Sequence, residues 1–135
     1  PAALTSVEVS GSADVELGNV FSTDITELST SGSGSISAAE INAKALKVDI
    51  SGSGTITVRG TCTSMDADIS GSGNLHAVDM AANAVDVDIA GSGKADVKAI
   101  STLNASVSGS GEVRYSGKPD LKSSISGSGS VMPLP

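Results

Sequence analysis

The chain has 135 residues, of which 39% are hydrophobic, but only Phe21 and Tyr115 are aromatic. This length fits one domain, predicted to span residues 1–135, and its core must be narrow because aliphatic side chains fill it in place of aromatic rings. Fifteen acidic residues against eight basic ones give a formal charge of -7 without any Lys/Arg cluster, so nucleic acid is not an expected partner. The single cysteine, Cys62, excludes an intramolecular disulfide and a Cys-rich metal site.

The first residues of the chain and the length of its apolar runs indicate whether it carries a membrane span or an export signal. No apolar run approaches the roughly 18 to 20 residues that span a bilayer, and no charged-then-apolar leader precedes the first repeat. The chain starts at Pro1 and not at Met. We therefore expect a processed form from which any export signal or lipid anchor has been removed, with no transmembrane segment of its own.

The most regular feature of the chain is the motif Ser-Gly-Ser-Gly. It occurs five times unchanged, and Ser10-Gly11-Ser12-Ala13 and Ala90-Gly91-Ser92-Gly93 are variants of it. The first glycines of the seven copies stand at positions 11, 32, 52, 71, 91, 109 and 127, with steps of 21, 20, 19, 20, 18 and 18 residues. A near-constant period of this kind predicts a repeat protein in which each unit stacks on the next.

Apolar and polar residues alternate on both sides of each Gly-Ser motif, which predicts two strands in every repeat. After the motifs, the apolar positions in chain order are Val15 and Leu17, Ile36 and Ala38, Ile56 and Val58, Leu75 and Ala77, Ala95 and Val97, and Val113 and Tyr115. Before the motifs, the inward positions are Leu46, Val48 and Ile50, Met65, Ala67 and Ile69, Val85, Val87 and Ile89, Leu103, Ala105 and Val107, and Leu121, Ser123 and Ile125. A third inward position, on a short segment of variable length, is expected at Ile41, Cys62, Met80 and Ile100.

Two short strands cannot bury an apolar face alone, so each repeat must stack on its neighbours. We therefore predict an all-β fold, a right-handed parallel β-helix of about seven coils with Gly-Ser-Gly corners and a length on the order of 30 Å. Glycine at a corner allows backbone angles that a side chain would penalise. A flexible linker would not keep Val or Ile two residues before nearly every corner, and an antiparallel sandwich would not need identical corners.

The surface feature with the clearest chemical meaning is acidic. Asp49, Asp68 and Asp88 occupy matching outward positions before three corners, and Asp66 and Asp86 occupy the neighbouring outward position. In a parallel stack, equivalent residues lie about 4.8 Å apart, close enough for carboxylates to share a cation or to repel each other. The Gly-rich calcium repeat is absent and these residues lie outside the turns, so a solvated polar face is favoured and low-affinity cation binding stays open. No cofactor or metal site is predicted.

Catalysis has little support in the sequence. Paired carboxylates can cleave polysaccharides, but the chain lacks the aromatic platforms and long loops that build such sites. His76 has no second histidine near it and is expected to be an exposed strand residue. Cys62 is interpreted as a small interior or loop residue and not as a nucleophile, and Tyr115 is expected to fill the end of the core.

Three segments resemble a known family. They are Val-Asp-Ile-Ser-Gly-Ser-Gly-Thr-Ile-Thr-Val at 48–58, Val-Asp-Ile-Ala-Gly-Ser-Gly at 87–93, and the stretch at 111–131 that contains Tyr-Ser-Gly-Lys-Pro. With the seven motifs in register, they resemble the "putative auto-transporter adhesin head (GIN) domain" family over nearly the whole chain. The resemblance implies a right-handed parallel β-helix in exported or lipid-anchored proteins of the Gram-negative envelope, and it supplies no catalytic residues. Ala13 departs from the pattern, since it replaces the second glycine of a corner. The chain is also short for the family, so the resemblance implies that it is the C-terminal part of a longer exported protein.

These observations predict a non-catalytic, adhesin-like structural and interaction module of the cell envelope or the extracellular space. Its partner would be a surface ligand, either a glycan or a protein. The alternative is a self-assembling scaffold in which open coil ends stack into filaments. Pro1, Pro133 and Pro135 argue against it, because proline cannot donate to a continuing strand ladder.

Overall fold

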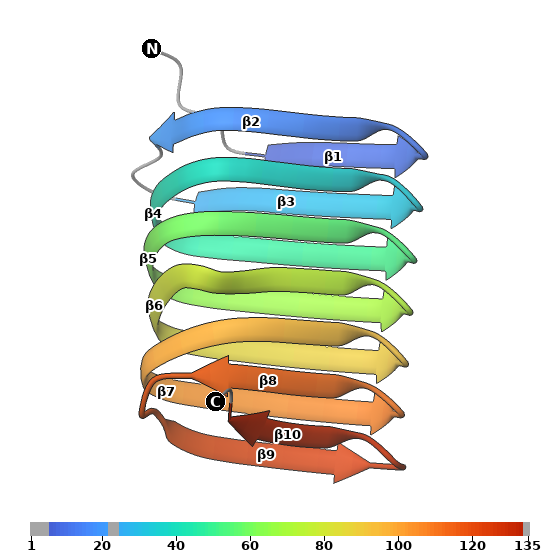
Figure 1. Ribbon diagram of the computed structural model, residues 1–135, viewed down its shortest axis with the longest axis vertical. Coiled ribbons are helices and arrows are strands. Elements are labelled where there is room, and N and C mark those ends of the chain that lie inside the picture. The colour runs from blue at the N-terminus through green and yellow to red at the C-terminus, as the bar shows by residue number, and fades with distance from the viewer. Residues whose placement is uncertain (1–5, 22–24, 134–135) are drawn as a thin grey trace.

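The computed structural model describes residues 6–21 and 25–133, where all regular structure is β-strand. Short strands lie at both ends of the chain and four long strands lie between them (Figure 1). Their bounds are β1 Ser6–Gly11, β2 Asp14–Phe21, β3 Ile25–Gly32, β4 Ser35–Gly52, β5 Thr55–Gly71, β6 Asn74–Gly91, β7 Lys94–Gly109, β8 Glu112–Ser116, β9 Asp120–Ser126 and β10 Ser130–Pro133.

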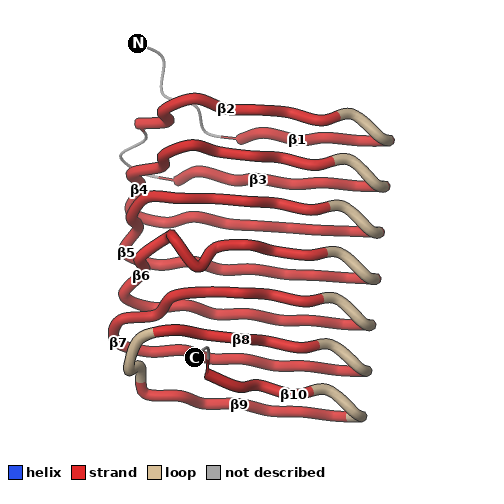
Figure 2. Tube along the Cα trace, viewed as in Figure 1, coloured by secondary structure: helices blue, strands red, loops and turns tan. Residues whose placement is uncertain are grey.

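The strands stack in parallel as a solenoid with two opposed walls (Figures 1 and 2). One wall contains β1, β3, the C-terminal halves of β4 to β7, and β9. The other contains β2, the N-terminal halves of β4 to β7, β8 and β10. The parallel β-helix prediction is confirmed, with about six turns in place of seven coils, because the outermost corners belong to incomplete turns.

Each internal coil is one continuous strand that bends, and not two separate strands. The strands β4 to β7 are 16 to 18 residues long and run from one glycine corner to the next. The register between neighbours shifts where the chain passes between the walls, for example between Ala38 and Ile41 and between Ala77 and Ala81. The variation in repeat length falls in this segment, as the sequence predicts.

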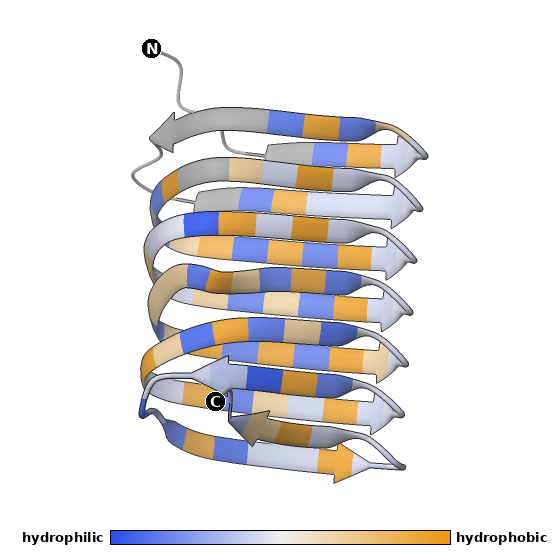
Figure 3. Cartoon of the chain, viewed as in Figure 1, coloured by the Kyte–Doolittle hydropathy of each residue, from blue (hydrophilic) through white to orange (hydrophobic). Residues whose placement is uncertain are grey.

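Aliphatic side chains from both walls meet in one continuous core. Figure 3 shows hydrophobic and polar residues alternating along the strands, as the period of two requires. Of the positions predicted to face inward, those fully buried are Ile36, Ala38, Ile41, Leu46, Val48, Ile50, Ile56, Val58, Cys62, Met65, Ala67, Ile69, Leu75, Ala77, Met80, Val85, Val87, Ile89, Ala95, Val97, Leu103, Ala105, Val107 and Val113. Stacking in register places like residues on each other, so the isoleucines at 50, 69 and 89 form one row along the rod axis.

Four positions predicted to face inward are wrong, because Ile100, Leu121 and Ile125 are exposed and so is Ser123. Ile100 is 52% exposed, and Ala99 is buried in its place opposite Ala82, because β7 is two residues shorter than β6. Leu121 and Ile125 are exposed because β9 pairs with β7 alone and no strand covers its other side.

For other positions near the ends of the core the prediction holds only in part, and some of these positions lie outside the described residues. Ser123 is exposed for the same reason as its neighbours in β9. Tyr115 is partly buried and packs against the core near this end, in keeping with its predicted role. Pro1, Pro135 and the side chain of Leu17 lie outside the described residues.

After the first corner, which carries Ala13, glycine is required twice in each corner, for two different reasons. Gly71 has a φ of +103°, in the left-handed region, and a Cβ added there would lie 2.6 Å from the carbonyl oxygen of Gly52 in the preceding corner. Gly73 has no such φ, but a Cβ there would overlap the Ile50 side chain of the preceding coil. The glycines at 32, 52, 91, 109 and 127 repeat the first case, and those at 34, 93, 111 and 129 closely repeat the second.

Backbone hydrogen bonds hold these corners against one another. The amide of Ser72 donates to the carbonyl of Gly52 at 2.9 Å, and the amide of Asn74 donates to the carbonyl of Gly54 at 3.0 Å. The same pair of bonds recurs at successive corners. The corner is therefore a hydrogen-bonded stack in its own right, which a side chain at either glycine would push apart.

We predict that Gly71→Ala lowers the free energy of unfolding by about 2 to 4 kcal/mol, because it adds backbone strain and a collision with the preceding corner. The matched control is Gly11→Ala. Gly11 also has a positive φ, of +85°, but an added Cβ would meet nothing within 4 Å. The control should lose only about 1 kcal/mol of backbone strain. Urea denaturation measures both variants, and equal losses would contradict the stacking argument.

We also predict that Thr30→Val stabilises the fold. Thr30 lies in the row of buried aliphatic residues, opposite Ile50, and its Oγ1 has no hydrogen-bond partner among the described residues. Removing a buried hydroxyl without a partner should raise the free energy of unfolding by about 1 kcal/mol, seen as a higher urea midpoint at unchanged slope. Thr57→Val, at a half-buried outward position, should show no such gain. A loss of stability in Thr30→Val would refute the prediction.

Candidate functional site

The five aspartates identified in the sequence come together on one surface. We call this surface the Asp face, meaning the outward side of β1, β3, the C-terminal halves of β4 to β7, and β9. Asp49 pairs in register with Asp68, which pairs with Asp88, and Asp66 pairs with Asp86 in the adjacent row. The parallel stack therefore places carboxylates from three successive coils side by side.

Two of the five aspartates, Asp68 and Asp86, have a raised pKa. Desolvation by burial raises the pKa of Asp68 above its ordinary value, and the charges of Asp66, Asp88 and Asp49 raise it further. Desolvation likewise raises the pKa of Asp86, with further contributions from Asp66 and Asp88. Each shift has the sign expected when negative charges crowd on a partly desolvated surface. The ladder of aspartates therefore carries like-charge strain at neutral pH.

Among the described residues, no Lys or Arg side chain forms an ion pair with these five carboxylates. Lys47 lies opposite Asp66 in register, and its charge lowers the pKa of Asp68 slightly against the other effects. The net charge of this patch is therefore negative. Its carboxylate oxygens face solvent or whatever molecule approaches them.

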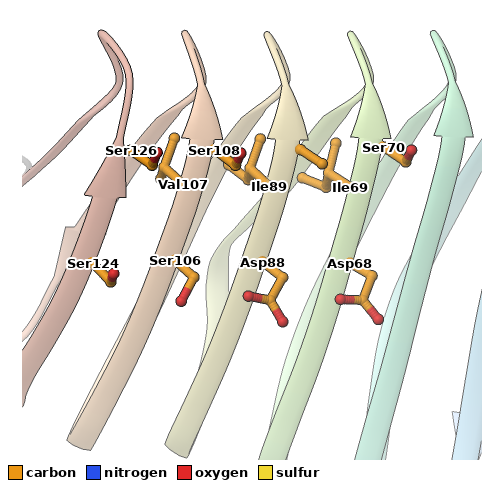
Figure 4. A pocket seen from close by; sticks show the side chains of 11 residues that line it. Asp68, Ile69, Ser70, Asp88, Ile89, Ser106, Val107, Ser108, Ser124 and Ser126 are labelled. Carbon is orange, nitrogen blue, oxygen red and sulfur yellow. The ribbon is translucent and has the colours of Figure 1, made fainter.

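The rows of the Asp face border a shallow hollow of about 480 Å³. Figure 4 shows Asp68, Asp88, Ser106 and Ser124 in one row, with serines in the row beside it. A second hollow of about 430 Å³ lies over Met65 between Lys47 and Asp86. Small side chains leave both depressions open, so the face offers hydroxyl and carboxylate groups at regular spacing on a gently hollowed surface.

The described residues contain no group of three His, Cys, Asp or Glu side chains arranged to hold a metal ion. Adjacent carboxylates of the ladder come from a regular sheet and point the same way, so they do not surround a common point. Calcium needs six to eight oxygen ligands around it, which a flat row of side chains does not supply. The geometry is that of a charged surface and not of a metal centre.

The opposite surface carries a neutralised cluster that the sequence analysis did not identify. The guanidinium of Arg114 donates two hydrogen bonds to the carboxylate of Asp96, of 2.9 and 3.0 Å. Glu112 lies 3.6 Å from the same guanidinium, and the Nδ1 atom of His76 lies 3.6 Å from Asp96. The hydrogen bonds to Asp96 raise the pKa of Arg114.

A signal for this cluster was present in the sequence. His76, Asp96 and Arg114 each stand three residues after the second glycine of a corner, which puts them in one row of the stack. Reading outward residues at equal distances from the corners would have paired Asp96 with Arg114. His76 is exposed, as predicted, and its one charged neighbour is a carboxylate that Arg114 already binds.

Cys62 faces the interior, where the sequence allowed either an interior or a loop position. It is buried between coils and unpaired, and burial raises the pKa of its thiol to about 11. At neutral pH the residue is a protonated thiol that packs as a small apolar side chain.

Comparison with known proteins bears on what such a surface does. A family model described as "Putative auto-transporter adhesin, head GIN domain" matches residues 1–119. The chain belongs to this family. The resemblance found in the sequence is thereby confirmed, and the stack of glycine corners is the structural basis of this GIN head domain. A search of curated proteins gave no match.

Solved structures with the same fold come from Parabacteroides and Bacteroides species. A "putative lipid binding protein" from Parabacteroides distasonis is 37% identical, with a TM-score of 0.93 over 96% of this chain and 53% of that one. A "putative adhesin" from the same organism is 28% identical, with a TM-score of 0.84 over 97% of this chain and 64% of that one. Another from Bacteroides fragilis is 27% identical, with a TM-score of 0.90 over 97% and 61%. The chain thus spans between about half and two thirds of these proteins.

The family is one of adhesin-like head domains, and neither the match nor the structural neighbours point to an enzyme. Within the described ranges there is no helix long and apolar enough to cross a membrane.

We predict that Asp68→Asn stabilises this GIN head domain at pH 7. The folded-state pKa of Asp68 is raised, so the protonated carboxyl favours folding at low pH and that contribution is lost as the pH rises through the raised value. Asparagine carries no charge, so it avoids the destabilisation that the ionised Asp68 causes at pH 7. The free energy of unfolding should rise by about 0.5 kcal/mol or less, because the group is largely solvated.

Thermal or urea unfolding at several pH values measures this effect. The gain of Asp68→Asn should shrink as the pH falls toward and below about 4, where the wild-type carboxyl is protonated as well. Asp79→Asn is the control, because Asp79 lies 3.7 Å from Arg59 and its loss should bring no gain. A gain that is independent of pH would show that repulsion is not its cause.

Proposed function

We propose that this GIN head domain is a non-catalytic interaction module of the bacterial envelope or the extracellular space, and that it binds its partner through the Asp face. The observation that carries the proposal is the row of stacked carboxylates from three coils, none of which forms an ion pair with Lys or Arg among the described residues. The family's description as an adhesin head fits a domain whose main property is an exposed, regular binding surface.

The two sides of the rod differ in how their acidic groups are balanced. On one side Arg114 neutralises Asp96 within the fold. On the Asp face, desolvation raises the pKa of Asp68, and the charges of neighbouring aspartates raise it further against a smaller opposing effect of Lys47. A partner with positive charge would relieve the repulsion between these carboxylates. This relief would favour binding, because the fold itself does not provide it.

The shape of the Asp face favours an extended partner. Its rows repeat at about 4.8 Å along the rod, and the hollow beside Asp68 and Asp88 continues past Ser106 to Ser124. A surface polymer that bears cationic groups, either a basic protein segment or an amino sugar chain, could contact several coils at once. We propose this class of ligand for the domain.

We also propose that this chain is one part of a longer protein. The chain spans 53% to 64% of its solved neighbours, in keeping with our expectation that it is the C-terminal part of a longer exported protein. In that arrangement the rod would carry the Asp face away from the rest of the polypeptide, toward a partner surface.

The test is binding of the 135-residue chain to arrays of glycans and matrix proteins, with and without calcium. The triple variant Asp49→Asn, Asp68→Asn, Asp88→Asn should lose most of the signal on basic or amino-bearing ligands. Because the attraction is between charges, wild-type binding should also weaken as salt increases.

The matched control removes three charges from elsewhere on the rod, with Asp14→Asn, Glu16→Gln and Asp79→Asn. It should bind as the wild type does, since these exposed residues lie off the Asp face. Equal losses in both triple variants would mean that net charge, and not this face, governs binding. Binding that requires calcium would overturn the cationic-partner proposal and support cation bridging by the ladder.

A further inference from the structure

The bend that joins the two walls has an outward side of its own, on the left in Figure 1. Two rows of residues run along it from coil to coil. The first row pairs in register and consists of Asn42, Thr61, Ala81, Lys98 and Ser116. The second row stands two residues further along each coil and consists of Lys44, Thr63, Asn83, Ile100 and Lys118. All ten residues are exposed or half-buried, and we call them the Lys edge.

Two of the three lysines lie on adjacent coils with an isoleucine between them. After β7 the paired residues before and after the bend stand 18 positions apart in the sequence. The same offset places Ile100 beside Lys118, and Lys98 precedes Ile100 by two residues in its own coil. Ile100 is 52% exposed. Lys98 and Lys118 therefore flank one exposed aliphatic side chain.

The Lys edge has the opposite charge to the rest of the rod. The chain has fifteen acidic and eight basic residues, yet the ten residues of this edge include three lysines and no acid. Among the residues that the structure describes, none of the three lysines forms an ion pair. Lys44 and Lys118 stand four coils apart, which is about 19 Å at roughly 4.8 Å per coil. The fold thus collects lysines that are distant in the sequence into one positive strip.

Hydroxyl and amide groups lie between the lysines. The Oγ1 atom of Thr61 donates to the Oδ1 atom of Asn42 at 2.9 Å, which orients the Asn42 amide and leaves its NH2 group for a ligand. Thr63 and Asn83 are exposed in the neighbouring row. Groups of this kind hydrogen-bond sugar hydroxyls, while lysine ammonium groups pair with carboxylates and sulfates.

We propose that the Lys edge binds an anionic polysaccharide that lies along the rod axis. Its carboxylate or sulfate groups pair with the lysines, its hydroxyls bond to the amide and hydroxyl groups, and Ile100 contacts the apolar face of a sugar ring. A membrane surface fits less well, because Ile100 is the one large apolar residue of the edge. Nucleic acid fits less well, because the edge has no aromatic side chain on which bases could stack.

This site is separate from the Asp face and has the opposite charge. At physiological ionic strength charges are screened over about 8 Å, so the acidic groups elsewhere on the rod do not prevent local pairing at the Lys edge. The domain would then hold an acidic polymer on one side and a cationic partner on another.

Isothermal titration calorimetry of the 135-residue chain, without calcium, tests the site with polygalacturonate, heparin and uncharged dextran. The wild type should bind at least one of the two acidic polymers, more weakly as salt rises, and should not bind dextran. Binding of polygalacturonate alone would identify carboxylates as the ligand groups, and binding of heparin alone would identify sulfates. The triple variant Lys44→Gln, Lys98→Gln, Lys118→Gln should bind at least about tenfold more weakly, because several charge contacts are lost together.

The matched control, Lys47→Gln, Lys94→Gln, Lys122→Gln, removes the same charge from exposed lysines on the two walls. It should bind as the wild type does. Equal losses in both triple variants would overturn the proposal, because net charge and not this edge would then govern binding.

The length of the ligand tests the geometry. Oligomers long enough to join Lys44 to Lys118 should bind more tightly than a disaccharide, and Lys44→Gln should weaken only the longer ones. Equal effects of Lys44→Gln on both would contradict a ligand laid along the rod.

Other polyanions test the class of ligand. No binding of either acidic polymer, or tighter binding of phosphatidylglycerol vesicles or duplex DNA than of the polysaccharides, would overturn the proposal. The variant with Asp49→Asn, Asp68→Asn and Asp88→Asn should bind the acidic polymers no less tightly than the wild type. This result is independent of whether the Asp face binds a cationic partner.

Discussion

The contact between successive glycine corners constrains the rest of this rod. At each corner a carbonyl oxygen of one coil lies close to where a Cβ of the next coil would be, and backbone amides of that next corner donate to carbonyls of the preceding one. No side chain fits between them, so the coils approach to the spacing of hydrogen-bonded strands at this edge. Every coil is thereby held at the same height and in the same register as its neighbours.

A fixed register turns single residues into rows. Inside, it stacks isoleucine on isoleucine, which lets a core almost without aromatic rings fill its space with branched aliphatic side chains. Outside, it sets equivalent residues side by side whether or not they attract. On one wall this brings Asp96 to Arg114, and on the other it crowds the aspartates and raises the pKa of Asp68. The like-charge strain of the Asp face thus follows from the same constraint that stabilises the fold.

The constraint also explains why the ends of the rod matter. A solenoid has no natural last coil, so each end must be closed by a departure from the repeat or by another molecule. At the first described corner Ala13 takes the place of the second glycine, where later corners leave no room for a Cβ. At the other end of the described stack β9 keeps the repeat pattern, and its apolar row is left exposed.

The sequence by itself determined the repeat, the corner glycines, the inward alternation and the alignment of the five aspartates. These are properties of period and spacing, and a parallel stack converts equal spacing from a corner directly into spatial adjacency. Its family resemblance followed from the same motifs.

The sequence did not determine two features: which residues are buried in the bend between the two walls, and which are buried at the ends of the described stack. Ala99 and not Ile100 enters the core, because the register shifts where the chain bends between walls and no spacing rule predicts the size of that shift. Val9 is buried and Ile125 is exposed, although β1 and β9 each pair with a single strand in the described ranges. Both are decided by contacts between segments distant in the chain, so only the tertiary structure could reveal them.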